Sequence, residues 1–219
     1  MPAFPASPVS PAELLERWLP RAFAEADLPD DVRRSDMMLG VRLEGPGGGE
    51  WVLRIENGAL RVAPASRADT AFTFVQSVED WRGALWEGRG GAIGRAAAGL
   101  FRPGEGAAAA AGPPGVGAAP SAAALEQMRS LDGLVRIVVH GGEGGDFAVG
   151  FKLGPGAIPE RPSATLSVSA SDAAAMERGE IDPLAAFMAG RIRVEGDMTL
   201  VMQMQAIQMQ AALAAKKQA

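Results

Sequence analysis

Residues 179–198 read GEIDPLAAFMAGRIRVEGDM and contain the start and end signals of one short helix. Asp182 is a good N-cap residue, and Pro183 suits the first helical turn, where a missing N–H is tolerated. Gly190 stands where a helix commonly ends, because glycine adopts the left-handed conformation without strain. These signals predict a helix of about two turns that ends at Gly190.

A strand and a longer helix follow in the sequence. Ile192 and Val194 alternate with charged residues, which is the two-residue period of a strand with one buried face. Gly196 and Asp197 then form a turn, and Asp197 caps the helix that follows.

This last helix carries no charged residue between positions 198 and 210. Steps of 100° per residue place its apolar side chains on two nearly opposite faces. One face holds Leu200, Met204, Ile207 and Ala211, and the other holds Met198, Met202, Met209 and Leu213. The first face can cover the sheet of its own domain, whereas the second needs another apolar partner. That partner is the other domain, a partner subunit or an apolar ligand, and such faces are more often core or interface than ligand sites.

Alternating apolar residues predict strands in both halves of the chain. In the first half the strands are residues 37–43, 51–55, 60–62 and 71–76, and in the second half 134–139, 147–153 and 165–169. Asn57-Gly58 predicts a two-residue hairpin turn of the primed type. Helices are expected after Ser10, Ser77, Ser121 and Ser171-Asp172, and Pro20 is expected to bend or break the first of them.

The two halves repeat the same order of elements. A shift of 96 positions matches residues 41–45 with 137–141, and a shift of 94 matches Ser77 with Ser171. A stretch rich in alanine, glycine and proline separates the copies and is typical of a linker. We therefore expect a degenerate first repeat (1–105), a linker (106–120) and a second repeat (121–219). The last helix has no counterpart in the first repeat.

The composition argues against several classes of function. A net charge of −5 disfavours electrostatic binding to nucleic acid or anionic membranes. Cysteine is absent and His140 is the only histidine, which removes thiolate metal sites and most histidine-dependent catalytic sets. His140 is expected to be an ordinary solvated or hydrogen-bonded residue. We expect no catalytic residue, no bound metal and no cofactor.

No run approaches the roughly 18 apolar residues of a membrane span, and the N-terminus has no signal-peptide pattern. We therefore expect a cytoplasmic protein without stable membrane insertion. Residues 88–94 (GRGGAIG) hint at a phosphate-binding loop but do not follow a strand in a βαβ unit. This stretch is expected to be a loose connection or a helix end.

The stretch 163–198 resembles the sterol carrier protein type 2 domain, and its most specific part is 179–198, with its proline-started helix and Gly-Asp-Met turn. The likeness covers roughly residues 121–219, while residues 1–105 resemble the same domain more loosely. The resemblance implies an α+β fold of two sterol-carrier-like repeats, each a mainly antiparallel sheet covered by helices. It also implies an apolar cavity in the second repeat, partly closed by the last helix.

Members of that family bind lipids without performing chemistry on them, so the resemblance implies a non-catalytic lipid carrier. The expected partner is a fatty acyl, phospholipid, sterol-like or quinone-like molecule, or another apolar small molecule. The candidate apolar lining consists of Phe147, Phe151, Met176, Phe187, Met188, Met198, Met202 and Met209.

A second interpretation belongs to another class of function. The free face of the last helix would dock a partner enzyme or a second subunit in a homodimer, and no lipid would be carried. Enzymatic activity is the least favoured reading, because so few residues suit catalysis.

Overall fold

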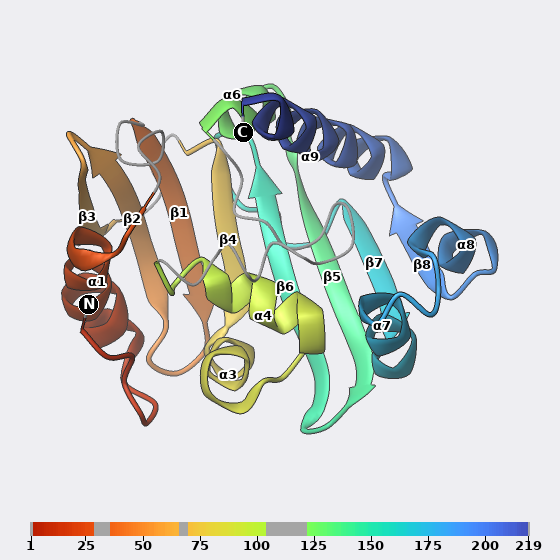
Figure 1. The fold of residues 1–219 in the computed structure, drawn as a ribbon, viewed down its shortest axis with the longest axis horizontal. Helices are drawn as coiled ribbons and strands as arrows, with labels where there is room; N and C mark the ends of the chain where they lie inside the picture. The colour runs from red at the N-terminus through yellow and green to blue at the C-terminus, as the bar shows by residue number, and fades with distance from the viewer. Residues whose placement is uncertain (1, 29–35, 66–69, 104–121, 219) are drawn as a thin grey trace.

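The computed structural model describes residues 2–28, 36–65, 70–103 and 122–218. The described strands form a single sheet in the order β3-β2-β1-β4-β6-β5-β7-β8 (Figure 1). The first half contributes β1 (Met37–Glu44), β2 (Gly49–Glu56), β3 (Ala59–Pro64) and β4 (Phe72–Ser77). The second half contributes β5 (Gly133–Gly142), β6 (Gly145–Leu153), β7 (Ala164–Ser169) and β8 (Ile192–Gly196).

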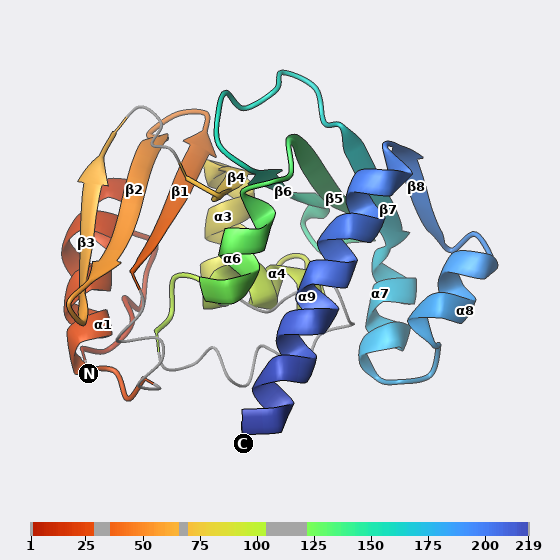
Figure 2. The same cartoon turned by 90° about the horizontal axis from the view of Figure 1, so that it is seen from above.

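The helices lie on one side of this sheet (Figure 2). Those of the first half are η1 (Glu13–Trp18), α1 (Leu19–Glu25), α3 (Val78–Arg82), η2 (Gly83–Glu87) and α4 (Gly91–Gly99). Those of the second half are α6 (Ala122–Met128), α7 (Ala170–Glu177), α8 (Pro183–Met188) and α9 (Met198–Gln218). The segments η1 and η2 are π-helical.

Both halves share one strand arrangement. The first strand pairs antiparallel with the second and parallel with the strand before the next helix: β1 with β2 and β4, and β5 with β6 and β7. Antiparallel pairs outnumber parallel ones, which confirms the α+β class. The arrangement is consistent with an internal repeat, although the repeat itself stays a prediction.

The two halves do not have separate sheets, in contrast to the expectation of one sheet for each repeat. Strand β4 pairs antiparallel with β6 and joins the halves edge to edge. In the first half, β3 borders the outer side of β2, whereas in the second half β4 takes the equivalent place beside β6. The predicted linker, 106–120, lies outside the described residues, and the domain boundaries stay a prediction.

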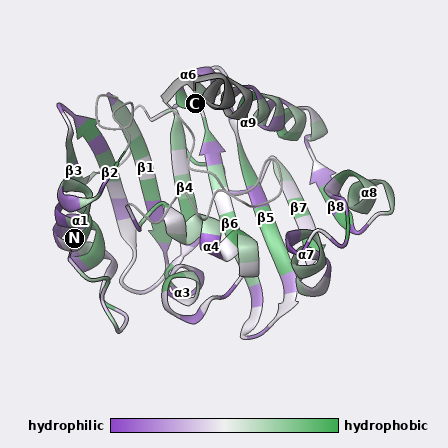
Figure 3. Cartoon of the chain, in the orientation of Figure 1, coloured by the Kyte–Doolittle hydropathy of each residue, from purple (hydrophilic) through white to green (hydrophobic). Residues whose placement is uncertain are grey.

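A continuous hydrophobic core fills the space between the sheet and the helices. Hydrophobic and hydrophilic residues are interleaved along the strands (Figure 3), so one sheet face is apolar. Fully buried side chains of this core come from both halves and include Leu14, Phe74, Trp81, Met128, Val135 and Met204. The two halves therefore stabilise each other through one shared core.

Pro20 does not break the first helix. It lies in the first turn of α1, which continues directly from η1. Proline removes one backbone donor, and the wider π-helical turn before it leaves room for the ring. The chain is helical on both sides of Pro20, so the expected break is wrong, whereas the bend that was the alternative stays a prediction.

The cap of α7 differs from the prediction by two residues. Ser169, not Ser171, accepts a hydrogen bond through Oγ from the backbone N–H of Asp172, at 3.0 Å. Ser77 does the same before α3, where the donor is the N–H of Asp80 at 2.9 Å. The equivalent serines are thus 92 positions apart rather than 94. The sequence offers two serines in close succession, and because β7 ends at Ser169 and α7 begins at Ala170, the first of them is the cap.

Candidate functional site

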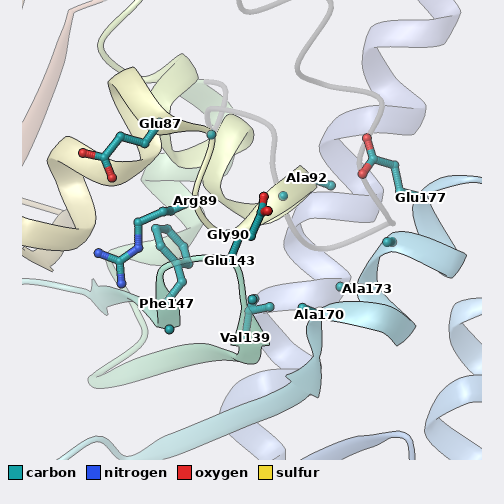
Figure 4. Close-up of a pocket in the computed structure, with 15 residues that line it drawn as sticks. Glu87, Arg89, Gly90, Ala92, Val139, Glu143, Phe147, Ala170, Ala173 and Glu177 are labelled. Atoms are coloured by element: carbon teal, nitrogen blue, oxygen red, sulfur yellow. The ribbon is translucent and has the colours of Figure 1, made fainter. Parts of the chain in front are cut away.

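A pocket lies where the two halves of the chain meet (Figure 4). One wall is the segment 87–92, which connects η2 to α4, and the other walls are the β5–β6 hairpin and α7. The volume of the pocket is about 210 Å³. It exists because the β4–β6 pairing places α4 beside α7.

The floor of the pocket is apolar. Val139 and Phe147 are directly opposite each other in the β5–β6 pairing, so both side chains point to the helix-covered face. Ala92, Ala170 and Ala173 add small apolar surface from α4 and α7. Small residues on the helices leave the space that larger side chains would fill.

Glycine is required where α4 begins. Gly90 has φ 78° and caps α4, and a Cβ there would lie 2.5 Å from the Phe147 ring. Any other residue would push the start of α4 away from the sheet. Residues 88–94, expected as a loose connection or a helix end, are a packed helix start that follows η2 rather than a strand.

Two arginines connect the walls of the pocket. Arg89 donates from Nη2 to the carbonyl oxygen of Asp146 at 3.0 Å and from Nη1 to Glu79 at 3.3 Å. Its side chain is only 10% exposed. Arg95 of α4 forms an ion pair with Glu177 of α7. These contacts hold elements of both halves at a fixed spacing.

The turn of the β5–β6 hairpin is held by Asp146. The backbone N–H of Gly141 and the ring of His140 both hydrogen-bond its carboxylate and lower its pKa, with the Gly141 contribution the larger. His140 Nδ1 lies 2.8 Å from Asp146 Oδ2. This is the hydrogen-bonded role that the sequence predicts for His140. The contact between His140 and Asp146 positions a turn.

The predicted lining residues divide into three groups. Phe147 lines this pocket, and the others do not. Phe151 and Met176 are partly buried against the core. Phe187, Met188, Met198, Met202 and Met209 are exposed on α8 and α9, with exposed fractions of 78% for Met188 and 63% for Met202. Their part in ligand binding stays a prediction.

The two faces of α9 behave differently. Leu200, Val201 and Met204 are buried and Ile207 is partly buried, so the first apolar face covers the core. The second face, with Met198, Met202 and Met209, is exposed among the described residues. The side chains of Ala211 and Leu213, placed on these faces by the helical period, lie outside the described residues.

The sequence does not indicate several of the residues that line the pocket. Ala92, Ala170 and Ala173 carry no chemical signal, and Glu87 and Glu143 resemble ordinary surface charges. The available signal was the density of glycine and alanine in residues 88–94 and 170–175, since small residues allow close approach of backbones.

In the part of the chain that the structure describes, histidine, aspartate and glutamate side chains form no cluster of three or more that could hold a metal ion. Within those same ranges, every helix is too short or too polar to cross a bilayer.

Comparison with known proteins identifies one family. Residues 116–209 match the SCP-2 sterol transfer family. Hydroxysteroid dehydrogenase-like protein 2 from Xenopus tropicalis and from Xenopus laevis is 30% identical over 87 residues. That region is 37% of this chain and 21% of each relative, so the chain spans only a small part of their length.

Solved structures give similar matches. The sterol carrier protein domain 2 of Helicoverpa armigera is 27% identical over 39% of this chain and 73% of its own, with a TM-score of 0.28. A UbiJ-SCP2 ubiquinone synthesis protein is 11% identical over 90% of both chains, with a TM-score of 0.25. The sequence match thus makes residues 116–209 of this chain similar to the SCP-2 sterol transfer family, and it does not extend to the first half of the chain.

Proposed function

We propose that the protein binds an apolar lipid without changing it chemically, and that part of the lipid occupies the pocket between the halves. The match of residues 116–209 carries this proposal, because an SCP-2 domain implies lipid binding or transfer. The pocket supports it, since its floor is apolar and two of its walls come from the matched residues. Fatty acyl, phospholipid, sterol-like and quinone-like molecules all carry a suitable apolar group.

The size of the pocket limits how much lipid it holds. Its volume of about 210 Å³ is below the roughly 300–1,000 Å³ of typical small-molecule pockets. Each buried methylene contributes about 0.8 kcal/mol, so a partly inserted chain still gains several such increments. In this proposal the remaining part of the lipid and its polar end lie at or outside the mouth.

Native mass spectrometry of the full chain tests the proposal. Protein purified without detergent is expected to carry an adduct of lipid mass that disappears after organic extraction. Ala174→Leu places a larger side chain on the pocket wall and is expected to reduce adduct occupancy roughly tenfold. Ala24→Leu, at an exposed position of α1, is the matched control. Wild-type protein that carries no adduct and takes up no added decanol would overturn the proposal.

Docking of a protein partner is a second candidate function, favoured by one observation. The large apolar side chains exposed in the described residues all belong to α8 and α9: Leu184, Phe187, Met188, Met198, Met202 and Met209. Exposed apolar surface of this kind often marks an interaction site. In this proposal, these side chains contact a partner or the protruding part of a lipid.

Light scattering over a concentration series tests the docking of a second copy. Met202→Glu is expected to shift the protein towards monomer without lowering its stability, because Met202 is 63% exposed. A wild-type chain that stays monomeric at every concentration would remove self-association as the role of this surface.

A further inference from the structure

We infer that the pocket selects its ligand by charge: it accepts apolar molecules whose polar end is neutral or cationic, and it disfavours carboxylates and phosphates. This ligand class rests on the proposed function, because it concerns the same pocket. It follows from the charged residues that line the pocket, which we call its rim: three carboxylates (Glu87, Glu143 and Glu177) and one guanidinium, that of Arg89.

Two of these carboxylates are unpaired. Glu87 ends η2 and Glu143 lies in the β5–β6 turn, and within the described ranges neither has a hydrogen-bond or ion-pair partner. Glu177 is already paired with Arg95. Figure 4 shows the three carboxylates on separate elements, with that of Glu87 on the same side as the guanidinium of Arg89 and that of Glu177 across the pocket. A polar group at the mouth therefore meets a negative field from more than one side.

Arg89 does not offset this field. Its guanidinium lies 3.3 Å from Glu79 and 3.4 Å from Asp80, so carboxylates outside the pocket already match its charge. Figure 4 shows the guanidinium pointing away from Ala92 and Glu177, which lie across the pocket. A ligand anion would have to compete with two existing partners for this arginine.

The N-terminus of α4 carries a partial positive charge that opposes the negative field of the rim carboxylates, but this positive charge is the smaller one. A helix N-terminus carries a partial positive charge of about half a unit, which attracts anions. The helix α4 has 9 residues, and it begins at Gly91 on the pocket wall. Glu87 and Glu143 each contribute a full negative charge, so the net field at the mouth remains negative.

Three ligands with the same ten-carbon chain separate charge from apolar burial. Decanol, decylamine and decanoate are titrated into the full chain by calorimetry at pH 7.5, below their micelle concentrations. At this pH the amine is protonated and the carboxylate is ionised. Decanoate is expected to bind at least about fivefold more weakly than decanol, and added salt is expected to reduce the difference.

Variants of the rim carboxylates test whether these charges cause the difference in affinity between decanol and decanoate. The double variant Glu87→Gln/Glu143→Gln is expected to bring decanoate to within about twofold of decanol. Glu160→Gln/Glu195→Gln removes two exposed charges outside the pocket and is expected to leave the ratio unchanged. Equal binding of decanol and decanoate to the wild type would overturn the charge selection and leave the proposed function standing. If no ten-carbon probe binds in a way that Ala174→Leu weakens, the proposed function at this pocket fails instead.

Discussion

Arg89 and Asp146 are joined across the middle of the molecule, where Nη2 of Arg89 donates to the Asp146 carbonyl oxygen over 3.0 Å. Asp146 is itself held by the N–H of Gly141 at 3.0 Å and by His140 at 2.8 Å. A hairpin inside the SCP-2 match is thus fixed to a segment outside it. The pocket keeps its shape because both partners of this contact are restrained.

Removal of the arginine is expected to loosen this junction. Arg89→Met deletes a hydrogen bond from a charged donor and leaves the Asp146 carbonyl without it, so the free energy of unfolding should fall by about 2–3 kcal/mol. Urea denaturation measures the change. Arg161→Met, at an exposed loop position, is the control and should change stability by less than about 0.5 kcal/mol. A loss for Arg89→Met as small as that of the control would show that the contact does not hold the halves together.

A buried lysine at the end of β6 offers a second test of stability. Lys152 is 1% exposed, and its Nζ donates to Asp132 and to the carbonyl oxygens of Leu153, Gly154 and Pro155. Lys152→Met leaves these carbonyls without their donor and is expected to cost about 2–4 kcal/mol. Asp132→Asn is expected to cost less than about 1 kcal/mol, because Asp132 is 87% exposed and the carbonyl contacts remain. Equal losses in the two variants would assign the stabilisation to the ion pair instead.

Acid should weaken the fold in part through Asp172. The hydroxyl of Ser169, and after it the guanidinium of Arg191, lower the pKa of this carboxyl below its ordinary value. A lowered folded-state pKa means that the carboxylate stabilises the protein above the pKa of the unfolded chain, about 3.9. That contribution is lost as pH falls through the folded pKa. The difference in melting temperature between wild type and Asp172→Asn should therefore be constant from about pH 7 to 5 and shrink below about 4. A difference that persists unchanged at pH 3 would contradict this.

Short-range features of the fold could be predicted because a few neighbouring residues decide them. Asn57 and Gly58 both have positive φ, at 52° and 77°, as a primed hairpin turn requires. Asp182 caps α8 by accepting from the N–H of Ala185 at 2.9 Å, and Gly190 has φ 72°. Caps and turns depend on backbone geometry within a few positions, so their sequence signals are direct.

The joining of the two halves could not be predicted in this way. The pairing of β4 with β6 places residues 72–75 beside residues 150–153. A local sequence pattern does not predict which strand edges pair over such a distance along the chain. The pocket depends on that pairing and is lined largely by glycine and alanine, which carry no chemical signal. The methionines of α9 were the stronger signal in the sequence, and because Met198, Met202 and Met209 are exposed, their part in ligand binding stays a prediction.

The shared sheet predicts that the second half does not fold alone as it does in the full chain. Strand β6 has β5 on one side and β4 on the other, with Phe72 opposite Leu153 and Val75 opposite Gly150. The rings of Phe72 and Phe151 stack with centroids 5.4 Å apart. A fragment of residues 121–219 loses β4, so the β6 edge and the Phe151 ring become free. Free edges of this length pair with other chains.

We therefore expect the fragment 121–219 to self-associate in light-scattering measurements, whereas co-expression with residues 1–105 should yield a one-to-one complex. Phe72→Ala in the co-expressed first half should weaken that complex, because the ring stacked on Phe151 is lost. Thr73→Ala, at the intermediate-burial position next to it in β4, is the matched control. If the fragment alone is monomeric and unfolds cooperatively near the melting temperature of the full chain, the β4–β6 pairing is dispensable and the halves are independent domains.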